Sequence, residues 1–167
     1  MKTRIILPDT EGISEAGAIL RDGGLVAFPT ETVYGLGANA LDAVATKHIY
    51  EAKGRPSDNP MIVHVASIDM LNEVASDVTD EQKAIMSKLW PGPVTFVLRK
   101  NPAVPDVTTG GLDTVAVRWP SRREAAEIIE AAGVPIAAPS ANLSGKPSPT
   151  TFEDVAEDMD GRIDAIV

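Results

Sequence analysis

The sequence predicts an α/β protein of the α+β type, in which helices flank a twisted sheet of mixed parallel and antiparallel strands. Three observations support this prediction. Short apolar runs rich in β-branched residues alternate with segments of helical spacing. The 13 Gly and 13 Pro residues are spread along the chain as turn signals. No repeat, low-complexity tract or Ser/Gly linker divides the 167 residues, so a single domain is expected over residues 1–167.

The expected strands are the apolar, β-branched runs. In chain order they are Arg4 to Leu7, Leu25 to Phe28, Ile62 to Val65, Val94 to Leu98, Val115 to Val117 and Ile136 to Ala138, and a further strand begins within Arg162 to Val167. The expected helices have apolar residues at helical spacing. They are Ile13 to Arg21, Ala43 to Ala52, Ile68 to Ala75, Asp80 to Leu89, Arg123 to Ala132 and Thr151 to Met159.

Local signals set several helix ends. Acidic residues in the first turn favour a helix start at Asp80, and Ser121 and Thr151 are expected to start the two later helices. Gly133 is a plausible stop for the helix before it. Pro91 and its neighbours end the helix before Trp90 and lead into the next strand.

Composition limits the chemistry. With 44% apolar residues the chain can form a core, and the absence of cysteine excludes disulfides, thiolate zinc sites, iron–sulfur clusters and cysteine nucleophiles. The formal net charge of -9 disfavours duplex nucleic acid as the main partner, because a phosphate footprint needs a basic face. No apolar run approaches the ~18 residues of a membrane span, and no secretory leader is evident, so we expect a cytoplasmic protein with no membrane partner.

The first candidate segment runs from Phe28 to Gly37, where an apolar strand gives way to hydroxyls, a carboxylate, a tyrosine and two glycines. A strand end of this kind suits a ligand in an open α/β sheet, and the alternative is a turn begun by proline. Gly35 to Ala40 also matches the G-x-G-x-x-[GA] pattern of dinucleotide sites. The match is weak, because the glycines do not lie in the first turn after the strand.

The second segment holds Lys53 and Arg55 on either side of Gly54, and it leads to a strand with His64. These two cations are expected to project from a loop and to suit a polyphosphate, because arginine binds oxygens bidentately and lysine acts as a point charge. The alternatives are a solvated basic helix end for the cations and a packed strand residue for His64.

The third and fourth segments are both strand ends. Arg118 ends an apolar strand beside Pro120, where it can bind a ligand carboxylate or phosphate or form a structural salt bridge. The strand before Ala138 ends in small residues and hydroxyls, so backbone groups can approach a ligand closely. A P-loop is excluded there, because Ser140 and Pro147 stand where that motif needs Gly and Ser or Thr.

Together these segments resemble the YrdC-like family of threonylcarbamoyl-AMP synthases. The resemblance extends over residues ~10 to 167. The matching motifs are Pro29-Thr30-Glu31-Thr32-Val33-Tyr34-Gly35-Leu36, Lys53-Gly54-Arg55 with Asn59-Pro60 and His64, Pro91-Gly92-Pro93-Val94-Thr95, Val117-Arg118-Trp119-Pro120, and Ala138-Pro139-Ser140-Ala141-Asn142-Leu143-Ser144-Gly145.

The resemblance implies a YrdC/RibB-like fold and a reaction in which L-threonine, bicarbonate and ATP give threonylcarbamoyl-AMP and pyrophosphate for the threonylcarbamoyl modification of adenosine in tRNA. Residues that resemble threonine contacts are Thr32, His64, Arg118 and the backbone at Ala138. Those that resemble ATP contacts are Arg55, Asn59, Thr114, Ser140 and Ser148, and Lys53 and Asn142 belong to the same paired signature.

We expect the catalytic set to be Lys53, Arg55, Ser140 and Asn142, with Lys53 and Arg55 holding the phosphates together with Mg²⁺. No resident protein metal site is expected, and the partners implied are the small-molecule substrates and tRNA or the downstream tRNA-modifying transferase complex. The family usually continues past Val167 with elements that complete its pockets, so the sequence is expected to represent a YrdC-like domain without them.

Two other functions remain open from the sequence. A nucleotide- or RNA-binding module without turnover would keep the same pockets, and the salt dependence of any RNA affinity would identify it. An oxidoreductase using Gly35 to Ala40 would need an acidic residue ~20 residues further on, whereas Glu51 lies only 11 residues beyond Ala40.

Overall fold

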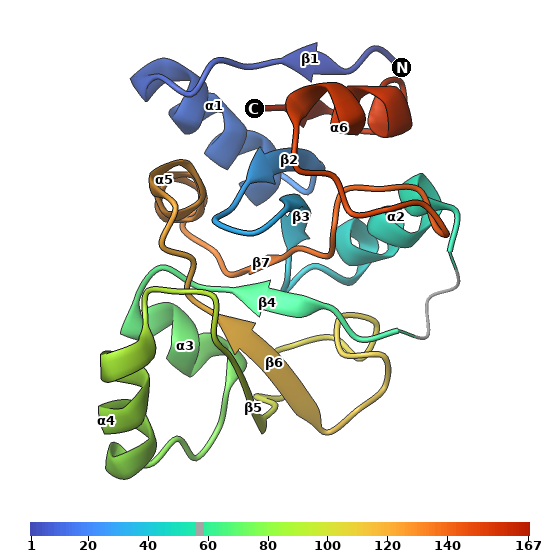
Figure 1. The fold of residues 1–167 in the computed structure, drawn as a ribbon. Coiled ribbons are helices and arrows are strands. Elements are labelled where there is room, and N and C mark those ends of the chain that lie inside the picture. Colours follow the sequence, from blue (N-terminus) through green and yellow to red (C-terminus); the bar gives the residue numbers. More distant parts are fainter. Residues whose placement is uncertain (56–58) are drawn as a thin grey trace.

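The strands form one mixed sheet (Figure 1). A computed structural model describes residues 1–55 and 59–167. Within these residues, eight strands lie in the spatial order β1-β8-β2-β3-β7-β4-β6-β5. β1, β8 and β2 are mutually parallel, as are β4 and β6, whereas β3, β7 and β5 run antiparallel to their neighbours. The strands are β1 (Arg4–Ile5), β2 (Val26–Pro29), β3 (Tyr34–Asn39), β4 (Ile62–His64), β5 (Thr95–Arg99), β6 (Thr114–Arg118), β7 (Ile136–Ala137) and β8 (Ala165–Ile166).

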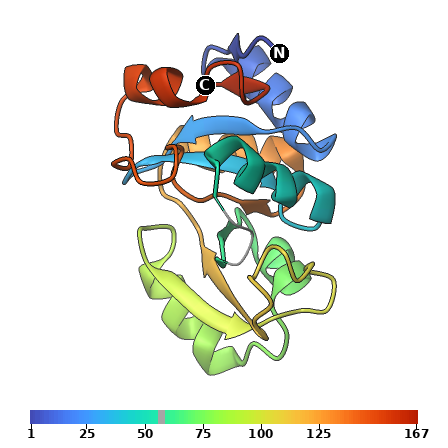
Figure 2. The same ribbon diagram turned by 90° about the vertical axis from the view of Figure 1, so that its right-hand side faces the viewer.

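Helices cover both faces of the sheet. They are α1 (Thr10–Arg21), α2 (Ala43–Lys53), α3 (Ile68–Val74), α4 (Asp80–Leu89), α5 (Arg123–Ala132) and α6 (Phe152–Met159). α5 and α2 lie on opposite sides of β2 and β3, as two views at right angles show (Figure 2). α1 packs closely on α5, since a Cβ built on Gly17 would lie 2.6 Å from the backbone of Ala131. The sheet and its helices confirm the predicted fold class.

Each predicted helix and strand is present, with ends that differ by a few residues. The segment Arg162 to Val167 does contain a strand, β8, and this strand lies between β1 and β2. Thr79 and Thr151 cap α4 and α6, and Gly133 ends α5 in the left-handed conformation with φ of 70°. Among the described residues, no helix is both long and apolar enough to cross a membrane.

The start of α5 differs from the prediction. Arg122, not Ser121, occupies the cap position, and it makes no capping hydrogen bond through its side chain. Ser121 is one residue further from the helix, and its hydroxyl instead donates to Glu31. The Ser121 hydroxyl, which the local pattern assigned to capping the helix, therefore binds the carboxylate of Glu31, a residue distant in the sequence.

β3 was not predicted from the sequence, because its two glycines resemble a turn. A Cβ on Gly37 would lie 2.7 Å from Cε1 of Phe28 and 2.9 Å from Cγ2 of Ile136. Glycine is therefore needed there so that the aromatic ring of β2 can pack against the sheet. Because the G-x-G pair lies inside a strand, it cannot form the strand-to-helix turn of a dinucleotide site, and that alternative is wrong.

Candidate functional site

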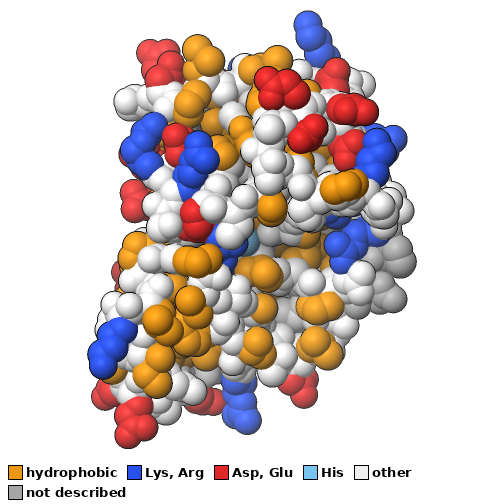
Figure 3. Space-filling model, in the orientation of Figure 1, with side chains coloured by type: hydrophobic (Ala, Val, Ile, Leu, Met, Phe, Trp, Pro, Cys, Tyr) orange, Lys and Arg blue, Asp and Glu red, His pale blue; other side chains and the backbone are white. Residues whose placement is uncertain are grey.

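A small cavity of about 210 Å³ lies where β4 and β6 end. These two strands are parallel, and His64 of β4 is in register with Arg118 of β6. Ligands in open α/β sheets commonly bind at such carboxyl ends. Figure 3 shows pale-blue histidine atoms beside blue basic atoms in a hollow between the upper and lower parts of the molecule. The lining residues are Thr30, Thr32, Val33, Gly35, Ile62, His64, Arg118, Ala138, Pro139 and Ser140.

Backbone pairing brings the distant segments to this cavity. The amide of Ala138 donates to the carbonyl of Ile62 over 3.0 Å, which places the end of β7 beside β4. Gly35 and Ser140 form an isolated antiparallel bridge, so the start of β3 lies against the same loop. A side chain at Gly35 would point at Ala138, because its Cβ would lie 3.3 Å from the Ala138 Cβ.

Arg118 is buried at the cavity and held by two side chains. Its Nη1 donates to Oγ1 of Thr32 over 3.2 Å, and its Nη2 forms an ion pair with Oε1 of Glu31. Burial lowers the pKa of Arg118, but arginine stays charged in proteins. The two interpretations of Arg118 from the sequence are therefore compatible, since the residue both forms a structural salt bridge and lines the cavity.

His64 is a neutral side chain in this site. The residue is 3% exposed, and burial lowers its pKa from 6.5 to about 4, while the carbonyls of Ile62 and Ile136 act in the opposite direction. Its Nδ1 is buried without a hydrogen-bond partner in the described part of the chain. A neutral imidazole at the cavity wall can donate through one nitrogen and accept through the other.

Lys53 does not project from a loop. It is the last residue of α2, it is 2% exposed, and its Nζ donates to the carbonyl of Ser140 and contacts Oδ1 of Asn142 at 3.5 Å. Burial is the main cause that lowers its pKa to about 8, and the nearby charge of Arg55 lowers it further. The alternative of a solvated helix end is therefore wrong for Lys53, because its ammonium fastens the 140–144 loop.

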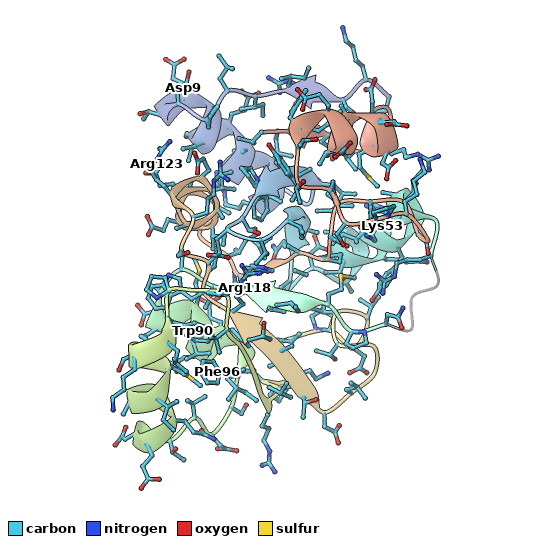
Figure 4. The ribbon with its side chains drawn as sticks, in the orientation of Figure 1. Asp9, Lys53, Trp90, Phe96, Arg118 and Arg123 are labelled. Carbon is cyan, nitrogen blue, oxygen red and sulfur yellow. The ribbon has the colours of Figure 1, made fainter. Side chains whose placement is uncertain are left out.

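The 140–144 loop is further held by Asn142 and by its own backbone. Nδ2 of Asn142 donates to the carbonyls of Leu143 and Lys146 over 2.8 and 2.9 Å, and the amide of Ser144 donates to the carbonyl of Lys53. Arg55 lies just beyond the αL cap at Gly54, with its guanidinium 5.5 Å from the centre of the Tyr50 ring. Figure 4 labels Lys53 at the end of α2 and Arg118 near the middle of the molecule, where β4 and β6 end.

The remaining predicted residues lie outside the cavity. Asn59 is exposed, and its carbonyl accepts a hydrogen bond from the Tyr50 hydroxyl. Thr114 is exposed and lies at the opposite end of β6 from Arg118. Because Ala116 of β6 pairs with Ile62, this end of β6 lies near the start of β4, just after Asn59 in the chain.

Ser148 is also exposed, and it borders a separate hollow of about 280 Å³ beside Lys146 and Asp158. The structure thus gathers Thr32, His64, Arg118, Ala138 and Ser140 around one cavity. Lys53 and Asn142 do not line this cavity, but the ammonium of Lys53 joins Asn142 to the carbonyl of Ser140 at its wall. Asn59, Thr114 and Ser148 are not among the lining residues either.

Sequence reasoning missed Glu31 and Ser121. Glu31 lies in the turn after β2, where it pairs with Arg118 and accepts hydrogen bonds from both the amide and the hydroxyl of Ser121. The signal available in the sequence was an acidic residue between Thr30 and Thr32, directly after an apolar strand.

Two larger hollows contain none of the predicted site residues among the described residues that line them. They measure about 680 Å³ beside Lys100 and about 630 Å³ beside His48. In the described part of the chain, no group of three or more His, Cys, Asp or Glu side chains is placed to hold a metal ion.

The fold and the cavity define an α/β domain with a small candidate ligand site at the ends of two parallel strands. The family model for Sua5/YciO/YrdC, described as "Telomere recombination", matches residues 18–167. The chain therefore belongs to the Sua5/YciO/YrdC family, as its sequence motifs indicated.

Curated relatives agree with this assignment. The threonylcarbamoyl-AMP synthase of Pyrococcus abyssi is 57% identical over 152 residues, which cover 91% of this chain and 45% of the relative. That of Bacillus subtilis is 55% identical over 156 residues, which cover 93% of this chain and 45% of the relative. This chain thus spans about half the length of these relatives.

A solved structure is similar in fold over nearly the whole chain. The crystal structure of P. abyssi Sua5 complexed with L-threonine matches with a TM-score of 0.91 and 53% identity, over 99% of this chain and 48% of that chain.

Proposed function

We propose that this chain carries the threonylcarbamoyl-AMP synthase site, a nucleotidyltransferase site that uses L-threonine, bicarbonate and ATP. One observation supports this proposal above the others. Thr32, His64, Arg118 and Ala138, the four positions that resemble threonine contacts, line one cavity, and Ser140 from the nucleotide group lies beside them. Relatives that share more than half of the aligned residues bear this name, and one of them was crystallised with L-threonine.

The threonine side of the reaction follows from the cavity's donors. Arg118 offers its guanidinium to the threonine carboxylate, because a guanidinium pairs with carboxylate oxygens in a directional way. Neutral His64 and the hydroxyl of Thr32 border the same space and are available to the other polar atoms of threonine. The free amine then attacks bicarbonate, the N–C bond of a carbamate forms, and water leaves.

In the second step, a carbamate oxygen attacks the α-phosphorus of ATP. The new P–O bond gives threonylcarbamoyl-AMP, and the bond to the β-phosphate breaks so that pyrophosphate leaves. Such a step depends mainly on alignment and on compensation of charge. We assign the compensation to Arg55 and to Mg²⁺ that arrives with the substrate as MgATP, with Asn59, Thr114, Ser140 and Ser148 along the nucleotide path.

The proposal changes the role expected for Lys53. Because its ammonium is buried against the Ser140 carbonyl and Asn142, we assign it to holding the 140–144 loop under the reactants instead of gripping phosphates. The product would serve tRNA modification in the cytoplasm, with tRNA or a transferase complex as the downstream partner.

The proposal is tested with the purified chain, MgATP, bicarbonate and threonine. We expect pyrophosphate release that requires both threonine and bicarbonate, and a loss of at least about tenfold in Arg55→Ala, or 1.4 kcal/mol of transition-state stabilisation. Lys47→Ala, an exposed substitution on α2, is the matched control. Unchanged turnover in Arg55→Ala would contradict the assignment of Arg55.

A nucleotide- or RNA-binding module is the second candidate function, because the same pockets could bind without turnover. ATP binding without any pyrophosphate release would favour it over the synthase. An RNA affinity that falls steeply with salt would point to phosphate contacts.

A further inference from the structure

Glu31 contacts Arg118 at the wall of the cavity. We propose that Glu31 is a positioning residue, which fixes the guanidinium of Arg118 for the substrate carboxylate and is itself fixed by Ser121. This inference rests on the proposed function, since it takes the threonine carboxylate to Arg118.

The first support is the way Glu31 is anchored. Its Oε2 accepts two hydrogen bonds from Ser121, one from the backbone amide and one from the hydroxyl at 2.5 Å. Its Oε1 faces Nη2 of Arg118. A carboxylate with one oxygen held by two donors cannot swing away without losing both bonds. Glu31 is thus a fixed partner of Arg118.

The second support is the burial of the pair. The side chains of Arg118 and Glu31 are 10% and 18% exposed, so their attraction is screened less by solvent than that of a surface pair. A guanidinium is planar, so fixing Nη2 and Nη1 also sets the directions of its other N–H groups. Nη1 is held by Thr32, and Nε has no hydrogen-bond partner in the described part of the chain. Glu31 therefore determines which N–H groups the cavity ligand meets.

The third support is the position of Glu31 and Ser121 in the fold. Glu31 lies in the turn between β2 and β3, whereas Ser121 lies between β6 and α5. The contacts of Glu31 thus tie two walls of the site together. They also explain why Ser121 does not cap α5.

Removing the charge of Glu31 has two opposite effects. It makes the site more positive, which by itself strengthens the binding of an anion, and it releases the guanidinium from its fixed direction, which weakens a directional pair. The tight anchoring predicts that the second effect dominates. We therefore expect the KM for threonine to rise at least about tenfold in Glu31→Gln, with a smaller change in kcat and no change in the KM for ATP.

Ser121 gives a second, milder variant. Ser121→Ala keeps the Glu31 carboxylate and the backbone donor but removes the hydroxyl, so we expect a rise of about threefold in the threonine KM. Ser121→Thr restores a hydroxyl and should return the KM to within about twofold of the unsubstituted chain. If Ser121 had only a structural role, Ser121→Thr would not restore the KM for threonine specifically.

Glu127→Gln is the matched control, because it removes an exposed carboxylate that pairs with Arg123 at 3.1 Å, away from the cavity. Thermal unfolding of each variant reports whether it folds, and the Ser121 pair keeps the test informative if Glu31→Gln does not fold. An unchanged or lowered threonine KM in Glu31→Gln, or no difference between the two Ser121 variants, would overturn this inference alone. Absence of threonine-dependent turnover in the unsubstituted chain would overturn the proposed function and this inference with it.

Discussion

Arg118 and His64 end two neighbouring parallel strands, and burial affects these two side chains differently. Arg118 keeps its charge, as arginine does in proteins, and the partly buried carboxylate of Glu31 pairs with it. No described carboxylate pairs with His64, and burial lowers its pKa to about 4. The candidate site therefore joins one fixed cation to one neutral imidazole.

The low pKa of His64 predicts a pH-dependent stability. In the unfolded chain this histidine binds a proton below its ordinary pKa of 6.5, whereas the folded protein binds it only near pH 4. The free energy of unfolding should therefore fall by up to about 3 kcal/mol as the pH drops from 6.5 to 4. Denaturant unfolding of the unsubstituted chain and of His64→Gln across this range measures the difference.

The exposed His48→Gln serves as the control for this measurement. A pH dependence that is the same in His64→Gln and in the unsubstituted chain would contradict the prediction.

At the site, the sequence identified the residues whose type and position after a strand both suggest chemistry. Arg118, His64 and Ser140 follow apolar runs, and the fold brings them together. The partners of these residues could not be predicted in the same way. Glu31 pairs with residues 87 and 90 positions further along the chain, and no local pattern records such contacts.

At the level of elements, β3 shows how packing overrides local preference. Its glycines favour a turn by propensity, yet they lie in a strand because Phe28 and Ile136 fill the space next to Gly37. A prediction from propensity alone cannot see this contact, because it forms between separate strands.

Gly37→Ala should therefore destabilise the protein. The new methyl group would lie within 3 Å of two buried side chains, and overpacking of this kind costs about 1 to 3 kcal/mol. Gly35→Ala on the same strand is the comparison, since its Cβ would meet Ala138 at 3.3 Å at the cavity wall. Thermal and denaturant unfolding should show the larger loss for Gly37→Ala, and equal losses would contradict this account.

The contact between the end of α2 and the 140–144 loop leads to a second pH effect, at alkaline pH. The pKa of Lys53 is about 8 in the folded protein and near 10.5 in the unfolded chain. Between these values only the unfolded chain keeps the proton, so the free energy of unfolding should rise with pH from about 8 to 10.5.

Comparison of the unsubstituted chain with Lys53→Met isolates this contribution, which should reach at most about 3 kcal/mol. Lys47→Met, on the exposed face of the same helix, is the control. A difference between the two proteins that stays constant over this pH range would show that the buried contact of Lys53 is not as described.

For the whole molecule, the sequence predicted which segments form helices and strands, but it did not predict the spatial order of the strands in the sheet. The types of nearly all helices and strands followed from apolar spacing and caps. The order β1-β8-β2-β3-β7-β4-β6-β5 joins residues from opposite ends of the chain, as in the pairing of Arg4 with Ala165. Such pairings depend on the packing of the complete chain.

The position of β8 predicts that the last six residues are essential for stability. They include Ile163, Ala165 and Ile166, which are buried, and β8 lies between β1 and β2. Deletion of residues 162–167 should abolish the cooperative thermal transition, because it removes an internal strand of the sheet. Deletion of the exposed Met1 and Lys2 is the control and should shift the melting temperature only slightly. A cooperative transition in the shorter chain would contradict the central role of β8.

The pairing of β2 with β8 also has a consequence for the protein while it is being made. β2 leaves the ribosome before β8 and can pair with β3 on one side, but β8, which covers its other side, lies more than 130 residues further along the chain. Until β8 has been made, the nascent polypeptide therefore presents an open strand edge with unpaired N–H and C=O groups, which is the kind of surface that invites aggregation and that chaperones shield.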